Sequence, residues 1–198
     1  MNTRTTSRKP RADVVRNRAR ILEAAETHFL TQGVAASLEA VAKEAGIGVA
    51  TLYRHFPTRE ALLAGLLNER RDELEKRQRR IDNLEDPGEA LRRWLRALED
   101  YLSLYNGLSE PLVIASKTSG SSNPLTRSCA DLITSTGDYL EAARAAGQAR
   151  DGIDGRDLFM AVSSVAWVRN TRAADDAALA RLRSIVESGY GRTGQTAR

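Results

Sequence analysis

Residues 48–56 read GVATLYRHF and combine small side chains with hydrogen-bonding ones. If this segment is helical, Val49, Leu52 and Phe56 lie on one side, because they stand three and four positions apart. On the other side, the threonine and arginine can bond to base edges, and the tyrosine and histidine can donate hydrogen bonds to phosphates. The spacing therefore predicts a face suited to nucleic acid, made of Gly48, Ala50, Thr51, Tyr53, Arg54 and His55.

Residues suited to catalysis are scarce in this chain. The only histidines are His28 and His55, and the single cysteine is Cys129. Neither Cys129 nor any serine has a base partner at a recognisable spacing, so the sequence does not indicate an enzyme. The same scarcity leads us to expect no metal site and no cofactor.

The sequence also bears on the cellular compartment. One cysteine cannot form an internal disulfide, which is typical of a reducing compartment. The first thirty residues lack the apolar core of a signal peptide. The longest apolar-rich run, residues 158–168, has 11 residues, fewer than the roughly 20 that span a bilayer. We expect a cytoplasmic protein without a membrane partner.

Positive charge is concentrated in the N-terminal third. Residues 1–60 contain ten Lys and Arg against six Asp and Glu, whereas the rest of the chain has twenty of each. Within residues 1–20, seven basic residues face a single acid, Asp13. This asymmetry favours a polyanionic partner such as nucleic acid. For residues 1–11, a basic arm that contacts nucleic acid and a disordered solubilising tail are equally good interpretations.

Apolar residues recur with a helical period along the whole chain, which predicts an all-α fold of about nine helices. In the first third, Gly33 ends one helix, a second starts after Ser37 and ends at Gly46, and a third spans about 49–56. The first helix is expected to carry one apolar face, made of Val14, Ile21, Ala25 and Phe29.

The later helices also have clear start signals. Pro57–Thr58 begins a charged fourth helix that reaches roughly Ile81. The segment DPGE at 86–89 supplies an N-cap acid, a first-turn proline and a capping-box glutamate for a fifth helix that ends near Asn106–Gly107. The remaining starts are Glu110–Pro111, Asn123–Pro124, Asp154 with Asp157, and Asp175–Asp176, while Gly147 ends the seventh helix and Val168 the eighth.

The second and third helices are too short to pack in parallel, so they must cross. Ala42 and Gly46 are small at the point where these helices approach each other. This pattern is typical of a helix-turn-helix, whose second helix lies in the DNA major groove. Ser37 at the start of the second helix and Arg59 in the first turn of the fourth would add phosphate contacts.

Residues 20–66, with RILEAAETHFLTQG followed by SLEAVAKEAGIGVATLYRHFPTREALL, resemble the DNA-binding domain of the TetR family of bacterial transcriptional regulators. The match covers the first third of the chain, and TLYRHF with the segment after it is specific to the family. The residues at the family's DNA-contact positions are Ser37, Val49, Ala50, Thr51, Tyr53, Arg54, His55 and Arg59. The resemblance implies that Tyr53, His55 and Arg59 chiefly contact phosphate. Several members have polar residues where Val49 and Ala50 stand, so no operator sequence follows.

The resemblance also implies a regulatory domain of about six helices that encloses a small-molecule pocket and forms a homodimer through its last two helices. In the fifth helix, Leu91, Trp94, Leu98, Tyr101 and Tyr105 share one face. A core stripe is the simpler interpretation, particularly for Leu91 and Leu98. A ligand cavity against this face, lined by Trp94, Leu98, Tyr101 and Tyr105 and joined by Trp167, is the alternative.

These patterns together predict four segments. They are a flexible arm at 1–11, a helix-turn-helix domain at 12–57 with its recognition helix at 48–56, a regulatory domain at 58–190, and a flexible tail at 191–198. The expected function is a dimeric repressor that binds an inverted repeat in double-stranded DNA and is released by a small-molecule effector. One alternative is a regulator without a ligand, either an activator or controlled by a protein. A weaker one is a helical enzyme or interaction module that binds no DNA.

Overall fold

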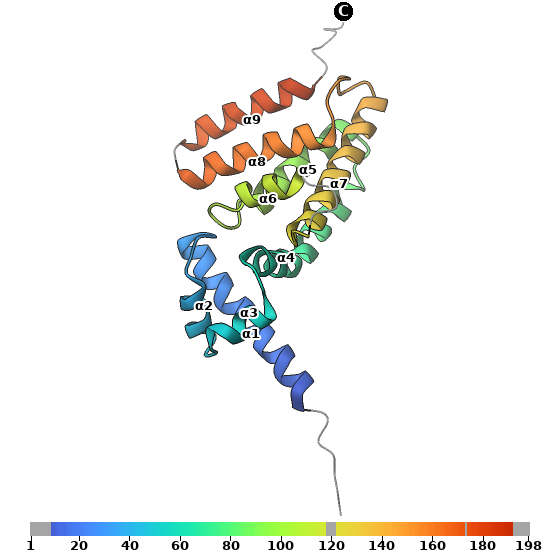
Figure 1. Cartoon of the computed structure of the whole chain (residues 1–198). Helices are drawn as coiled ribbons and strands as arrows, with labels where there is room; N and C mark the ends of the chain where they lie inside the picture. The colour runs from blue at the N-terminus through green and yellow to red at the C-terminus, as the bar shows by residue number, and fades with distance from the viewer. Residues whose placement is uncertain (1–8, 118–121, 173, 192–198) are drawn as a thin grey trace, which may run out of the picture.

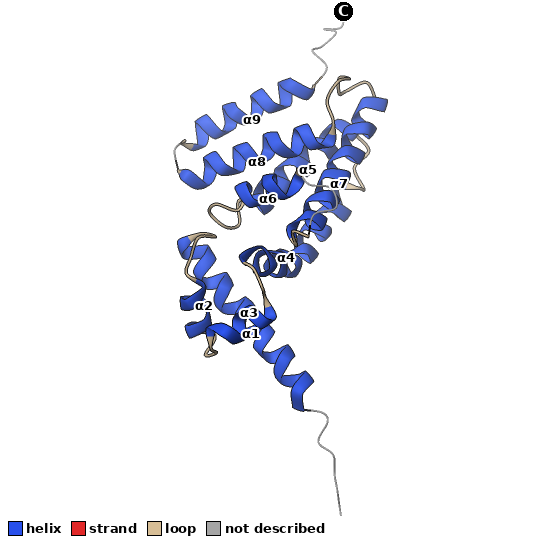
Figure 2. Ribbon diagram, in the orientation of Figure 1, coloured by secondary structure: helices blue, strands red, loops and turns tan. Residues whose placement is uncertain are grey.

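The computed structural model describes residues 9–117, 122–172 and 174–191, and within them it contains helices and no strand (Figures 1 and 2). The prediction of an all-α fold with about nine helices is confirmed. The helices are α1 (Lys9–Gln32), α2 (Leu38–Glu44), α3 (Val49–His55), α4 (Arg59–Ile81), α5 (Pro87–Leu102), α6 (Ser109–Ser116), α7 (Leu125–Ala145), α8 (Gly155–Thr171) and α9 (Asp176–Tyr190).

Helices α1 to α3 form a small N-terminal unit around a shared apolar core. Ile21, Ala25 and Phe29 are fully buried on α1, and Leu52 is fully buried on α3. The expectation that Val14 belongs to the same buried face is wrong, because α1 extends beyond α2 and α3 at its N-terminal end and leaves this side chain 54% exposed (Figure 1).

The chain ends fall largely outside the described residues. The flexible arm expected at 1–11 lies there except for its last three positions, which already belong to α1. The tail expected at 191–198 lies there except for Gly191, which pairs with Ala149 in an isolated bridge.

Side-chain caps set most of the helix starts. Ser37, Thr58 and Asp175 each accept a hydrogen bond from a backbone N–H of the helix that follows. At α8, the backbone N–H of Asp154 donates to Asp157 Oδ2 and the N–H of Asp157 donates to Asp154 Oδ1, both at 2.9 Å, as the sequence predicted.

The start and end of α5 differ from the prediction. Asp86 caps the helix, but the carboxylate of Glu89 turns to Arg92 and Arg93 instead of closing a capping box. The helix ends at Leu102, because the chain turns there and brings Asn106 against the N-terminal unit, where its carbonyl accepts from the backbone N–H of Val34 at 2.8 Å.

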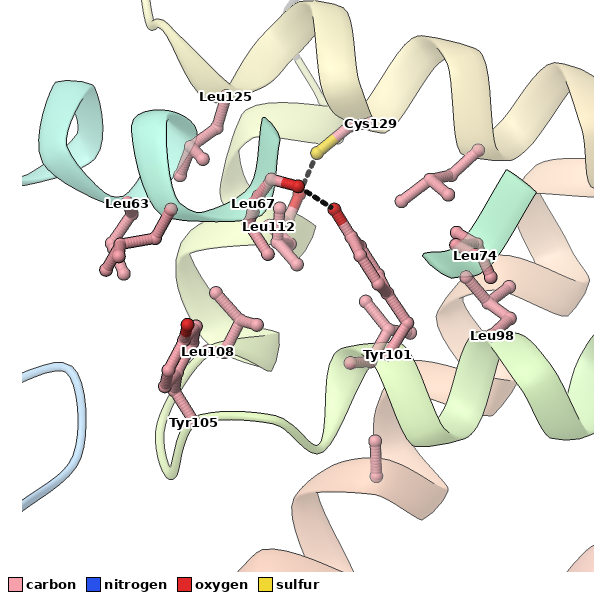
Figure 3. Close-up of a cluster of buried hydrophobic side chains, with 14 of the residues drawn as sticks. Leu63, Leu67, Leu74, Leu98, Tyr101, Tyr105, Leu108, Leu112, Leu125 and Cys129 are labelled. Atoms are coloured by element: carbon pink, nitrogen blue, oxygen red, sulfur yellow. Dashed lines mark hydrogen bonds between the residues drawn. The ribbon is translucent and has the colours of Figure 1, made fainter. Parts of the chain in front are cut away.

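Helix α5 lies at the centre of the C-terminal part, with α4, α7 and α8 packed around it and α9 beside α8 (Figure 1). The five residues of the predicted stripe are buried, with exposures between 0% and 8%, but Tyr105 lies in the turn after α5 and not on the helix. Trp94 Nε1 donates to Thr136 Oγ1 on α7 at 2.9 Å. Figure 3 shows the second bond, in which the Tyr101 hydroxyl donates to the Leu67 carbonyl on α4 at 3.0 Å. These bonds satisfy the polar ends of two aromatic side chains inside the core.

Two neighbouring acids on α5 form ion pairs with arginines on three other helices. Glu99 is 3% exposed and accepts two hydrogen bonds from Arg183 on α9, at 2.6 and 2.8 Å. Asp100 lies between Arg77 on α4, at 2.9 Å, and Arg169 on α8, at 2.7 Å. Partial burial works to raise the pKa of Asp100, but the hydrogen bonds from Arg169 and Arg77 outweigh it and hold that pKa below its usual value.

Helices α7 and α8 approach each other closely at Gly155. A Cβ at this position would lie 2.6 Å from the Gly137 nitrogen and from the Ile133 carbonyl oxygen, whereas a Cβ at Gly137 would meet nothing within 4 Å. Both are backbone contacts that cannot move aside. The two glycines therefore offer opposite substitutions at one crossing.

We predict that Gly155→Ala lowers the free energy of unfolding by about 2 kcal/mol or more, because the added methyl forces the helices apart. Gly137→Ala should raise it by roughly 0.5 to 1 kcal/mol, because alanine favours a helix interior. Urea unfolding of both variants measures this difference. Equal effects of the two substitutions would contradict the close packing at Gly155.

Candidate nucleic-acid interface

The α2–α3 pair has the geometry of a helix-turn-helix. Gly46 turns the chain with a φ of +62°, a conformation that L side chains rarely adopt. The Ile47 backbone N–H donates to the Ala42 carbonyl at 3.0 Å and closes the turn. On the inner side, Leu52 and Phe56 are 0% and 2% exposed, so they anchor α3 to the core as the spacing predicted.

The outer side of α3 carries the polar residues expected there. Arg54 NH2 donates to Thr51 Oγ1 at 2.8 Å, and Arg54 Nε donates to the Ala50 carbonyl at 3.3 Å. This pair of bonds holds the guanidinium along the helix face beside the small Ala50. All the predicted contact residues are exposed or half-buried, namely Ser37, Gly48, Val49, Ala50, Thr51, Tyr53, Arg54, His55 and Arg59.

Ser37 is engaged at the start of α2. Its hydroxyl accepts from the Ala40 backbone N–H at 3.3 Å and donates to Glu39 Oε2 at 2.7 Å. The hydrogen bond from Ser37 lowers the pKa of Glu39, so this carboxylate is charged at neutral pH. A phosphate approaching Ser37 would therefore meet an acid as well as the helix N-terminus.

Arg59 has a structural role that the sequence did not reveal. Its NH1 donates to the carbonyls of Val34 and Ala36, at 2.5 and 2.7 Å, in the loop between α1 and α2. The arginine thus connects the start of α4 to that loop. It reaches the loop only because α1 and α4 pack side by side, which no local sequence signal indicates.

Two further arginines lie against the same unit. Arg18 stacks over the Phe56 ring with its Cζ 4.6 Å from the ring centroid. Arg20 lies over Gly46, where a Cβ would have to push its guanidinium aside. The sequence showed both residues only as part of the N-terminal positive charge.

Comparison with known proteins identifies both parts of the chain. Residues 21–66 match the family model of bacterial regulatory proteins of the tetR family, and residues 86–191 match the model of an SbtR-like transcriptional regulator C-terminal domain. The chain belongs to the TetR family. The members of this family are transcriptional regulators, not enzymes, and their N-terminal helix-turn-helix domain precedes a helical C-terminal domain.

Solved TetR-family structures agree with this assignment. A TetR regulator from Streptomyces coelicolor is 36% identical, with 89% of this chain and 99% of that chain covered and a TM-score of 0.54. A TetR regulator from Mycobacterium vanbaalenii is 28% identical, with 92% and 99% covered and a TM-score of 0.50. No match is found among curated proteins.

The C-terminal domain of this TetR-family chain has a small hollow between α4, α5 and α7. It encloses about 70 Å³ and is lined by residues that include Trp94 and Tyr101 from the predicted ligand face. Arg71 on α4 and Asp131 on α7 form an ion pair of 2.9 Å among its lining residues. Leu98 and Tyr105 are buried elsewhere in the core, and the Tyr105 hydroxyl has no hydrogen-bond partner among the described residues.

Trp167 does not join this hollow. It is 54% exposed on α8, because the side of this helix that carries Leu158, Val162 and Val165 takes the core positions. Cys129 also gives no sign of reactivity, since burial raises the pKa of its thiol to about 12. Among the described residues, no group of three or more possible metal ligands occurs, and no helix is long and apolar enough to cross a membrane.

We predict that Arg59→Ala lowers the free energy of unfolding by about 1 to 3 kcal/mol, because two loop carbonyls lose a charged donor. Arg79→Ala is the matched control, since Arg79 lies exposed on the same helix and makes only a 3.8 Å pair with Glu75. Urea unfolding of the two variants tests this. If Arg59→Ala is as stable as the control, Arg59 does not hold the loop.

Proposed function

We propose that the protein is a ligand-responsive repressor that binds an inverted repeat in double-stranded DNA as a dimer. The observation that carries the proposal is the exposed face of α3, where Thr51 and Arg54 are hydrogen-bonded to each other beside the small Ala50. Small residues let the helix backbone approach the major groove, and a positioned guanidinium suits the acceptors of guanine.

The other residues of the interface position this helix. Tyr53, His55 and Arg59 chiefly contact phosphates, while Gly48 and Val49 lie at the start of α3, close to the bases. Ser37 contacts a phosphate at the start of α2. Contacts of this kind fix the register of the protein on DNA without reading the sequence.

The dimer forms through α8 and α9. Three large apolar side chains on these two helices are exposed, which supports this assignment. They are Met160 and Trp167 on α8, 41% and 54% exposed, and Ile185 on α9, 67% exposed. Exposed apolar groups gathered on neighbouring helices are typical of a surface that another protein covers. A second copy of the chain, related by a two-fold axis, would build a four-helix interface and place a second recognition helix on an inverted half-site.

The effector occupies the hollow between α4, α5 and α7. Enlarging this hollow displaces α4, which is joined through Thr58 and Pro57 to the recognition helix. The separation of the two recognition helices in the dimer therefore changes. The effector acts only to the extent that it binds the two arrangements with different affinity.

A regulator without a small-molecule effector is the second candidate. Two observations favour it, because the hollow is only about 70 Å³ and the polar ends of Trp94 and Tyr101 already have partners in the protein. The variant Tyr101→Phe with Tyr105→Phe separates the two cases. It alters the response of an effector-controlled repressor and leaves a protein-controlled regulator unaffected.

We predict that Arg54→Ala loses about 1 to 3 kcal/mol of DNA-binding free energy and discriminates less at one base pair. Tyr53→Phe should weaken all sequences uniformly, because it touches only phosphate. Fluorescence anisotropy on DNA fragments recovered with the purified protein from its own genome measures both effects. Unchanged affinity and unchanged base preference of Arg54→Ala would contradict the assignment of α3.

We predict that Trp167→Ala and Ile185→Asp shift the protein from dimer to monomer, because each removes an apolar contact from the α8–α9 face. Sedimentation equilibrium measures the dissociation constant. Ile114→Asp is the control, since Ile114 is also 53% exposed but lies on α6. An equal shift in all three variants, or none, would argue against this interface.

A further inference from the structure

A second hollowed region lies between α4 and α5, and it adjoins the proposed effector site at Leu74 and Tyr101, which line both. It consists of two adjoining hollows of about 210 and 290 Å³ that share Arg77, Ala97 and Asp100. We call their combined lining the arginine groove. Its floor is apolar and its rim is charged, with the floor formed by Leu74, Ile81, Ala97, Tyr101 and Leu104.

The rim of the arginine groove has an excess of positive charge. Five arginines line it, Arg70, Arg77 and Arg80 from α4 and Arg93 and Arg96 from α5, against the two acids Glu73 and Asp100. In the larger hollow, pairs of arginines three positions apart on α4 and on α5 contribute to one lining. An arginine guanidinium bonds a carboxylate with two parallel N–H groups and also stacks on aromatic rings.

The ion pairs of these arginines do not close the groove. Arg70 pairs with Glu26, Arg93 with Glu89 at 2.7 Å and Arg96 with Glu187 at 3.2 Å, and in these pairs the side chains are 28% to 59% exposed. Exposed pairs of this kind contribute only about 0 to 1 kcal/mol, so a bound anion can replace them at little cost. No acid pairs with Arg80 within the described part of the chain.

Asp100 is the one acid shared by both hollows, and it has a second partner. Its carboxylate is bonded to Arg77 within the groove and to Arg169 on α8. If Arg77 turns to a ligand, Asp100 keeps its bond to Arg169 and is not left without a counter-charge.

We propose that the arginine groove binds a small aromatic carboxylate. The carboxylate bonds to Arg77 and Arg80, and the ring lies on the apolar floor beside Ala97. A cationic rim over an apolar floor selects both halves of such a molecule, since the rim alone would accept any anion and the floor alone any apolar compound. The binding itself does not depend on DNA recognition. Only its consequence, a displacement of α4, rests on the proposed function.

Isothermal titration calorimetry with 2-naphthoate tests the proposal on the full chain. We expect one saturable site for 2-naphthoate and none for acetate or for neutral 2-naphthalenemethanol at the same concentrations. In Arg77→Gln/Arg80→Gln, affinity should fall about tenfold or more, because two charge-assisted bonds are lost. Ala97→Leu, which fills the floor of both hollows, should abolish binding.

Arg79→Gln is the matched control and should bind within about twofold of the wild type, because Arg79 does not line the groove. Thermal melting checks that every variant is folded. Absence of saturable binding to the wild type, equal binding of the neutral analogue, or unchanged affinity in both groove variants would overturn the proposal. None of these results bears on DNA binding, so the two proposals fail separately.

Discussion

The position of the helix-turn-helix domain depends on one short loop, residues 33–36, which is hydrogen-bonded to the α5–α6 loop and to the start of α4. The backbone N–H of Val34 donates to the Asn106 carbonyl in the α5–α6 loop, and the backbone carbonyl of Val34 accepts from Arg59 at the start of α4. Gly33 permits this contact, because its φ is +80° and a Cβ there would lie 2.8 Å from the Asn106 oxygen. The helix-turn-helix domain therefore cannot rotate against the C-terminal domain without breaking backbone contacts.

Helix α4 extends this constraint into the regulatory half of the molecule. Leu62, Leu63 and Leu66 near its start are almost fully buried, and Leu74 and Ile81 further along are buried against the C-terminal helices. The Tyr101 hydroxyl binds the carbonyl of Leu67 in between. Because one continuous helix belongs to both cores, a ligand that moves α4 must also move the recognition helix. Both proposed small-molecule sites lie along this helix, and Leu74 and Tyr101 line both of them.

Local signals in the sequence were sufficient for the helices and for the face of α3. The caps at Ser37, Thr58 and Asp154 act through bonds to residues three positions away, so the local sequence contains all their partners. The inward side of α3 follows from helical spacing alone, which is why Leu52 and Phe56 were predicted correctly.

Features that depend on distant partners were not predictable in this way. Arg59 bonds to carbonyls 23 and 25 positions away. The buried Glu99 has its counter-charges on α8 and α9, at Arg169 and at Arg183, which lies 84 positions later. Glu89 had the spacing of a capping box, yet two adjacent arginines offered stronger charge-assisted bonds. Tryptophan is usually a buried residue. Trp167 is exposed because the opposite side of α8 packs against α5.

The proposed function requires that two copies of α3 bind one inverted repeat. Hydroxyl-radical footprinting of the protein on a recovered genomic fragment tests it most directly. We expect two protected patches on inverted half-sites, with centres one helical turn of about 10 base pairs apart or a multiple of it. A single patch, or uniform protection that fades as salt is raised, would contradict it and reduce the N-terminal domain to a nonspecific basic surface.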